Sequence, residues 1–198
     1  MVLDLQEKDG ILGQGIFKPS PEDDESLKFA GKKEIPGDTF LVKTTGKTSP
    51  TTTGTVDNDW TDPANAFGAG GGHASTQDFN QDYSDFGITI PSDTIIKGIV
   101  VTIDGREQNV GNEGAVGVEL SWDGGTTYTE SGKVEIFRTN PGFETKVYGG
   151  QTDTWGREWT IGEFTDALFM LRGIKAPGDI GIGQTGVDHI QIEVYYSV

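Results

Sequence analysis

The sequence predicts an all-β protein, in which two antiparallel sheets form a sandwich that follows an extended N-terminal arm. The chain of 198 residues contains 30 glycines, and 10% of its residues are aromatic. Short runs of β-branched and aromatic residues recur at regular intervals, and turn residues separate them. This composition and spacing are typical of short strands joined by many turns. Because no internal repeat is present, a sandwich is favoured over a propeller.

Six runs of residues in the second part of the chain predict strands. The closing run is the clearest, since Ile190, Ile192 and Val194 alternate with polar residues and so place one face in a core. A turn of helix is expected over 161–166. The predicted strands cover 86–90, 95–103, 116–122, 134–137, 167–171 and 190–196.

The first 57 residues differ in composition from the rest. They contain Phe17, Phe29 and Phe40 as their only aromatic residues, whereas residues 58–198 hold all four tryptophans. Residues 44–55 (TTGKTSPTTTGT) have the composition of a linker, and 39–42 suffice for one short strand. We therefore predict an extended arm and linker over 1–57 and a β-sandwich domain over 58–198, with a disordered tail as the alternative for the arm.

Charge and composition exclude several classes of function. Fifteen Lys and Arg against 31 Asp and Glu give a formal net charge of −16, which opposes binding to nucleic acid. No run approaches the roughly 20 apolar residues of a membrane span, and the N-terminus lacks the pattern of a signal peptide. We expect a soluble protein made in a cytoplasm. The chain has no cysteine, so disulfides and thiolate metal sites are excluded.

Four stretches, taken together, resemble a jelly-roll domain that recurs in the virion proteins of tailed bacteriophages. They are DNDWTDPANAF (57–67), FGITIPSDTIIKGIVVTIDGR (86–106), VYGGQTDTWGREWT (147–160) and VDHIQIEVYYSV (187–198). The family pattern has Asn more often where this chain has Asp62. The matching positions are Trp60, Pro63, Ala66, Ile90, Pro91, Ile95, Gly98, Ile99, Tyr148, Gly149, Gly150, Asp153, Trp155, Gly156, Val187, Asp188, Ile190, Ile192, Val194, Tyr195 and Tyr196.

The resemblance implies a non-enzymatic structural protein on the exterior of a virion, made in the host cytoplasm. It implies a capsid decoration (cement) protein that forms a homotrimer, or alternatively a tail, neck or head-fibre protein. The arm would contact the major capsid protein through Ile16, Phe17, Phe29 and Phe40. Fold alone does not determine function.

The segment SWDGGTTY (121–128) has the spacing of an Asp-box, a hairpin motif of sialidases and other propellers. Asp123 can accept backbone hydrogen bonds across the turn, Gly124 and Gly125 permit positive φ, and Tyr128 can cover the hairpin. None of these roles needs a substrate. With Arg106, Arg138, Arg157 and Arg172 as its only arginines, the chain offers too few for a sialic-acid site, so we interpret the box as a structural turn.

Catalysis is not indicated, and no cofactor is expected. The conventional bases are His73, in a glycine-rich loop, and His189. His189 follows Asp188, but neighbours in a strand point to opposite faces, so the two do not form a dyad.

Two ligand sites are weighed as alternatives. Asp57, Asp59 and Asp62 bring oxygen donors close together, as a calcium loop would, although the EF-hand spacing is absent. The aromatic residues Tyr148, Trp155 and Trp159 suit a platform for surface glycans, as in a carbohydrate-binding or adhesion module, but they can equally cap the sandwich or fill a subunit interface.

Overall fold

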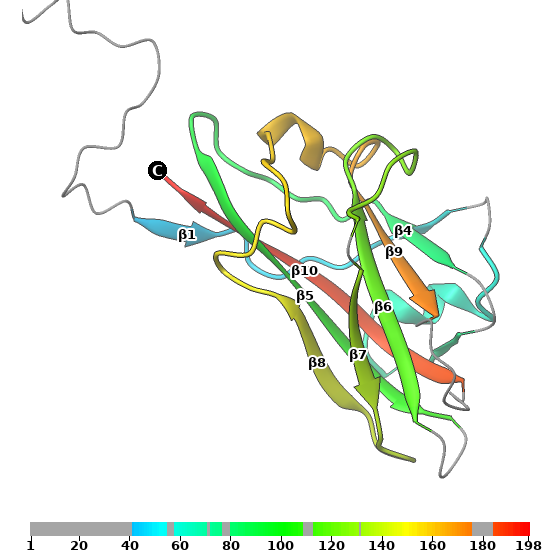
Figure 1. Cartoon of the computed structure of the whole chain (residues 1–198). Helices are drawn as coiled ribbons and strands as arrows, with labels where there is room; N and C mark the ends of the chain where they lie inside the picture. Colours follow the sequence, from blue (N-terminus) through cyan, green and yellow to red (C-terminus); the bar gives the residue numbers. More distant parts are fainter. Residues whose placement is uncertain are drawn as a thin grey trace, which may run out of the picture. The chain divides into compact units, whose positions relative to one another are not determined.

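The computed structural model describes residues 41–54, 58–70, 72–76, 80–108, 113–130, 132–175 and 184–198. Two five-stranded antiparallel sheets pack face to face, which confirms the predicted β-sandwich (Figure 1). The first sheet has the order β1 (Val42–Thr44), β10 (Thr185–Ser197), β5 (Ile95–Glu107), β8 (Glu144–Gly149), and β3 (Ala74–Ser75) also pairs with β10.

The second sheet has the order β2 (Thr52–Thr53), β4 (Gln81–Ser84), β9 (Met170–Lys175), β6 (Gly114–Ser121), β7 (Lys133–Phe137). Consecutive strands alternate between the two sheets except for β6 and β7, which gives the jelly-roll-like course of the chain. In the described residues, the connections contain the short 3-10 helices η2 (Pro63–Ala66) and η3 (Ile161–Phe164). The second confirms the helical turn expected over 161–166. In the described part of the chain no helix has the length and apolar character needed to cross a bilayer.

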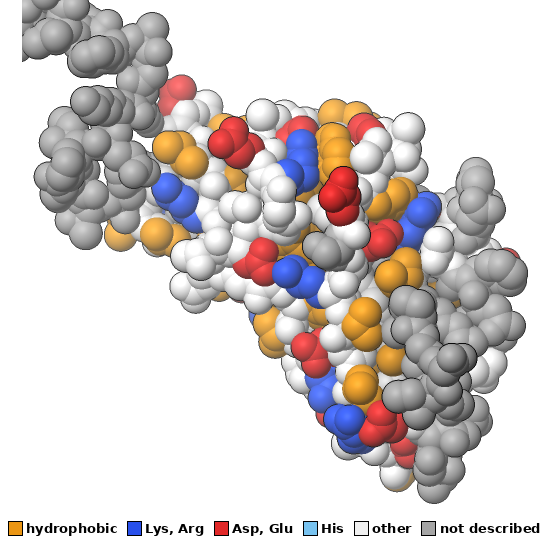
Figure 2. Space-filling model, in the orientation of Figure 1, with side chains coloured by type: hydrophobic (Ala, Val, Ile, Leu, Met, Phe, Trp, Pro, Cys, Tyr) orange, Lys and Arg blue, Asp and Glu red, His pale blue; other side chains and the backbone are white. Residues whose placement is uncertain are grey.

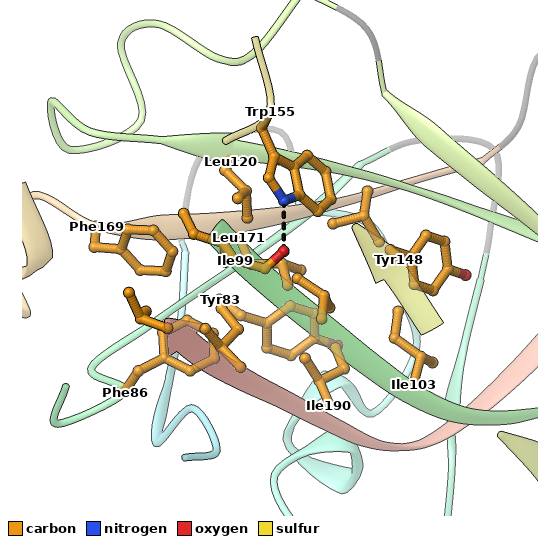
Figure 3. Packing of buried hydrophobic residues seen from close by; sticks show 14 of the residues in the cluster. Tyr83, Phe86, Ile99, Ile103, Leu120, Tyr148, Trp155, Phe169, Leu171 and Ile190 are labelled. Carbon is orange, nitrogen blue, oxygen red and sulfur yellow. Dashed lines mark hydrogen bonds between the residues drawn. The ribbon is translucent and has the colours of Figure 1, made fainter. Parts of the chain in front are cut away.

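The core lies between the two sheets and follows the predicted alternation. The long strands β5 and β10 run antiparallel through the centre of the first sheet and face β6 and β9 across the core (Figures 1 and 3). Ile190, Ile192 and Val194 are fully buried, while Gln191 and Glu193 between them are only half-buried. Burial of these apolar side chains supplies the main driving force for folding.

The predicted strand over 86–90 is wrong. Asp85 and Gly87 have φ angles of 55° and 63°, and these left-handed conformations interrupt an extended chain. Ile88 and Ile90 nevertheless pack against the core. Their alternation therefore reflects burial along an irregular segment and not pairing in a sheet.

The boundary predicted at residue 57 is also wrong, because part of the linker belongs to the sandwich. Val42 pairs with Ser197 of β10, and Thr52 pairs with Ser84 of β4. Edge strands need only backbone hydrogen bonds to join a sheet, so they require no apolar pattern. The arm residues Ile16, Phe17, Phe29 and Phe40, proposed as capsid contacts, lie outside the described residues.

Candidate functional site

Two segments of the resemblance meet at one end of the sandwich, in what we call the Ile99 junction (Gly98, Ile99, Gly150, Asp153 and Trp155). The carbonyl oxygen of Ile99 accepts hydrogen bonds from the Gly150 amide at 3.2 Å and from Trp155 Nε1 at 2.9 Å. The Ile99 amide donates to the Asp153 carbonyl at 3.0 Å. In Figure 3 the indole of Trp155 points into the core toward Ile99. The junction thus fixes the loop after β8 onto β5.

Glycines make the Ile99 junction possible. A Cβ atom at Gly98 would overlap the carbonyl oxygen of Gly150 and would lie 2.5 Å from the carbonyl carbon of Gln151. The loop then turns through left-handed residues, with φ angles of 76° at Gly149, 57° at Trp155 and 80° at Gly156. The motif residues are therefore explained by close backbone packing, without a ligand.

The hairpin over 121–128 forms the structural turn that the Asp-box predicts. Asp123 Oδ1 accepts hydrogen bonds from the amides of Thr126 at 3.1 Å and Thr127 at 2.8 Å. Gly124 and Gly125 adopt φ angles of 74° and 86°. Although burial opposes the change, the bonds from Thr127 and its neighbours lower the pKa of Asp123. Tyr128 covers the turn, since its hydroxyl would lie 2.9 Å from a Cβ at Gly125.

Arg157 stacks against the rings of Trp122 and Trp159 and holds them in place. The guanidinium of Arg157 lies 3.9 Å from the ring centroid of Trp122 and 4.3 Å from that of Trp159. Its Nη2 donates to Glu163 Oε1 at 2.8 Å, and Glu163 also caps η3 by accepting from the Thr160 amide. Burial opposes ionisation of Glu163, but the bonds from Arg157 and Thr160 lower its pKa. The charge of Arg157 is thus balanced where it stacks.

The guanidinium of Arg172, on β9 of the second sheet, packs against the ring of Tyr128. Arg172 lies 3.7 Å from the Tyr128 ring centroid and makes a bidentate pair with Asp82, at 2.8 and 3.0 Å. The Tyr128 hydroxyl donates to the same carboxylate at 3.1 Å. Burial and the charge of Asp82 both raise the pKa of Tyr128. Burial, opposed in part by Arg172, also raises the pKa of the neighbouring Glu119.

Two cavities flank Arg157 at this end of the molecule, and both are lined by Gly156 and Arg157. The hairpin cavity has a volume of about 300 Å³, and the loop cavity has about 610 Å³. Trp122, Tyr128, Thr129, Glu130 and Trp155 complete the hairpin cavity. Ile95, Ile96, Thr154, Glu158 and Trp159 complete the loop cavity.

Of the alternatives for Tyr148, Trp155 and Trp159, their burial opposes an exposed glycan platform and favours packing at the end of the sandwich. Their side chains are 1%, 5% and 8% exposed, and the Tyr148 hydroxyl donates to the Val116 carbonyl inside the core. Trp155 lines the hairpin cavity and Trp159 lines the loop cavity, although both are buried. The residues that line the hairpin cavity while staying partly exposed are Trp122, Tyr128 and Arg157, which sequence reasoning did not select. The sequence feature that indicates this lining is the pair of aromatic residues, Trp122 and Tyr128, at the two ends of the Asp-box turn.

The predicted oxygen donors do not meet at a metal site in the described residues. Asp57 lies outside them, and Asp62 has a left-handed conformation at the start of η2. Asp59 is exposed and bonds through its amide to the Asn80 carbonyl. Across the described ranges no group of three or more His, Asp or Glu side chains could hold a metal ion.

The two histidines have separate structural partners. His189 Nε2 lies 2.8 Å from Ser49 Oγ, whereas Asp188 accepts from the Gly70 amide at 3.1 Å. Asp188 and His189 thus bond to different partners, and the register of β10 shifts between Val187 and His189. Arg106 Nη2 lies 3.4 Å from His73 Nδ1, and burial together with the charge of Arg106 lowers the pKa of His73.

No family model matches the chain, and no curated protein matches it. Among solved structures, it is similar to a carbohydrate-binding module of the CBM28 type that is specific for non-crystalline cellulose. The TM-score is 0.35 at 12% sequence identity, and the match covers 72% of this chain and 95% of the module. A similarity at this level carries no argument about the ligand of this protein.

Proposed function

We propose that the chain is a non-enzymatic structural protein of a tailed-phage virion, of the capsid decoration type. In this proposal the N-terminal segment attaches to the major capsid protein and the sandwich is presented at the particle surface as a homotrimer. The sequence resemblance supports it, because the motif residues of two of its four stretches meet in the Ile99 junction. These motif residues pack against one another, as we expect of residues that maintain the fold of a shared domain.

The observation that carries the proposal is an exposed apolar corner (Leu41, Val42, Ile95 and Val198) where the N-terminal segment joins the sandwich. These side chains are 61%, 49%, 39% and 45% exposed. Val42 and Ile95 flank Ser197 on one face of the sheet, because Ser197 pairs with both, and the Val198 amide donates to the Leu41 carbonyl, so Leu41 and Val198 lie at the same corner on the opposite face. Among the described residues, β1 is at the edge of its sheet. An open edge bordered by apolar side chains suits addition of a strand from a neighbouring subunit.

The distribution of charge also supports a surface role. On the face shown in Figure 2, acidic and basic side chains are scattered among apolar ones. Several of the basic groups are neutralised by close partners, as in Lys133–Asp153 and Lys146–Glu144, at 2.8 and 2.7 Å. With a net charge of −16, like-charge repulsion would keep decorated particles apart in solution.

Binding of the full-length chain to particles assembled from the cognate major capsid protein tests this proposal. Val42→Lys places a charge on the open edge β1, so we expect at least about a tenfold loss of affinity. Val147→Lys is the matched control, because Val147 is 54% exposed on β8, the opposite edge of the same sheet. Co-sedimentation measures the bound fraction, and thermal unfolding shows that both variants fold. Absence of binding by the wild type, or equal losses in the two variants, would contradict the proposal.

A tail, neck or head-fibre protein is the second position within the virion, since the same segment would then serve as an attachment peptide. Electron microscopy of labelled particles separates it from capsid decoration. A carbohydrate-binding module is the alternative from another class. Its test cannot use Trp155→Ala, because that side chain is part of the Ile99 junction and its removal would damage the fold.

A further inference from the structure

We propose that the hairpin cavity binds one neutral pyranose ring of a glycan. This inference goes beyond the virion proposal and does not depend on it, because the cavity belongs to the sandwich alone. Three properties of the cavity lead to it, namely its aromatic walls, its charge and its size.

The aromatic walls are the first property. Trp122 and Tyr128 both line the cavity and are half-buried. One face of each ring is covered by a guanidinium, that of Arg157 at 3.9 Å and that of Arg172 at 3.7 Å. These contacts fix both rings before a ligand arrives. The apolar C–H groups on one face of a pyranose pack well against such preorganised aromatic surface.

The charge of the lining is the second property. Both guanidiniums are already paired, Arg157 with Glu163 and Arg172 with Asp82. Glu130, an exposed carboxylate, stands in the lining. A carboxylate accepts hydrogen bonds from sugar hydroxyls and repels anions. The cavity is therefore suited to a neutral sugar and opposes sialic acid, uronates and phosphates.

Size is the third property. A volume of about 300 Å³ is at the lower end of the range for small-molecule pockets, which fits a single ring and not a chain of sugars. The loop cavity adjoins it across Gly156 and Arg157, and it offers space for the next residue of a glycan. Rigid turns at Asp123 and at the Ile99 junction support both sides, so little ordering cost is expected on binding.

Titration of the full-length chain with methyl glycosides of glucose, galactose, mannose and N-acetylglucosamine tests the inference. We expect at least one of them to bind with a dissociation constant of about 1 mM, as is usual for ligands held by a few contacts. In nitrogen-15 NMR spectra the indole signal of Trp122, assigned with Trp122→Phe, should shift. The signal of Trp60, buried against Gly173, should not shift.

Two matched variants locate the site. Glu130→Gln removes the carboxylate of the hairpin cavity and should weaken binding about tenfold, the size expected for one hydrogen bond to a charged group. Glu158→Gln makes the same change in the loop cavity and should leave monosaccharide binding unchanged. Both residues are exposed, so neither variant should unfold. The inference is overturned if none of the four glycosides binds at a concentration about 10 times the expected dissociation constant. It is also overturned if methyl glucuronide binds as tightly as the neutral sugars, or if Glu158→Gln weakens binding more than Glu130→Gln does.

Discussion

Replacing Gly98 with alanine tests whether the Ile99 junction holds the sandwich together. The added Cβ would overlap the carbonyl oxygen of Gly150 and would lie 2.5 Å from the carbonyl carbon of Gln151. Because backbone is in the way, β5 and the loop after β8 must separate. The separation weakens three hydrogen bonds at Ile99, two to its carbonyl oxygen and one from its amide. At about 1 kcal/mol each, with about 1–3 kcal/mol for overpacking, the expected loss is about 4–6 kcal/mol.

Urea denaturation followed by tryptophan fluorescence measures this loss, and in thermal unfolding it corresponds to a decrease in melting temperature of about 8–24 °C for a domain of this size. Two glycines of the same region serve as controls. Gly156→Ala meets no atom within 4 Å but has a φ of 80°, so it should cost only about 1 kcal/mol. Gly162→Ala meets neither obstacle and should change stability by less than about 0.5 kcal/mol. If Gly98→Ala were as mild as Gly162→Ala, the close approach would not be a source of stability.

Two carboxylates should give pH effects of opposite sign. Asp123→Ala removes the acceptor for the Thr127 amide, so it should destabilise the protein by about 1 kcal/mol at pH 7. Because the pKa of Asp123 is lowered on folding, the difference in stability between variant and wild type should shrink as the pH falls through that pKa. The pKa of Glu119 is raised instead, chiefly by burial, so Glu119→Gln should stabilise the protein at pH 7. That gain should fade as the pH falls through the raised pKa toward the ordinary value. Urea denaturation at several pH values measures both, and parallel profiles for the two variants would contradict the assignment.

The fold could be predicted where the buried face of a strand carries several aliphatic side chains, and not where it carries a single aromatic residue, such as Tyr83 or Tyr148, among polar ones. The alternation over 190–196 and the apolar run over 95–103 correspond to β10 and β5, because each presents aliphatic side chains to the core. The strands β4 and β8, with the sequences QDYS and ETKVYG, were missed. Their side chains include Asp82 and Lys146, which are held in ion pairs. A polar residue on a strand is uninformative until its partner, distant in the sequence, is known.

The candidate site was only partly predictable for a related reason. Hydrogen bonds within a turn are local, so the roles of Asp123, Gly124 and Gly125 followed from their spacing. The exposure of an aromatic ring is not local, because it depends on which strand packs over it. The sequence left open whether Trp155 lies in a surface platform or caps the sandwich, and the choice is made by its bond to Ile99, 56 residues earlier. Trp122 was not selected, yet it stays partly exposed in the lining of the hairpin cavity.

At this end of the sandwich, some residues hold the fold and others line the cavities, and this difference bears on ligand specificity. The frame consists of residues whose identity is required by backbone packing, such as Gly98 and Trp155. The lining of the two cavities also includes Glu130 and Glu158, which are exposed. Substitution of these carboxylates therefore changes the chemistry of the cavities at little cost in stability, whereas substitution in the frame removes the cavities with the fold. Ligand specificity in such a domain is expected to reside outside the motif by which the domain is recognised.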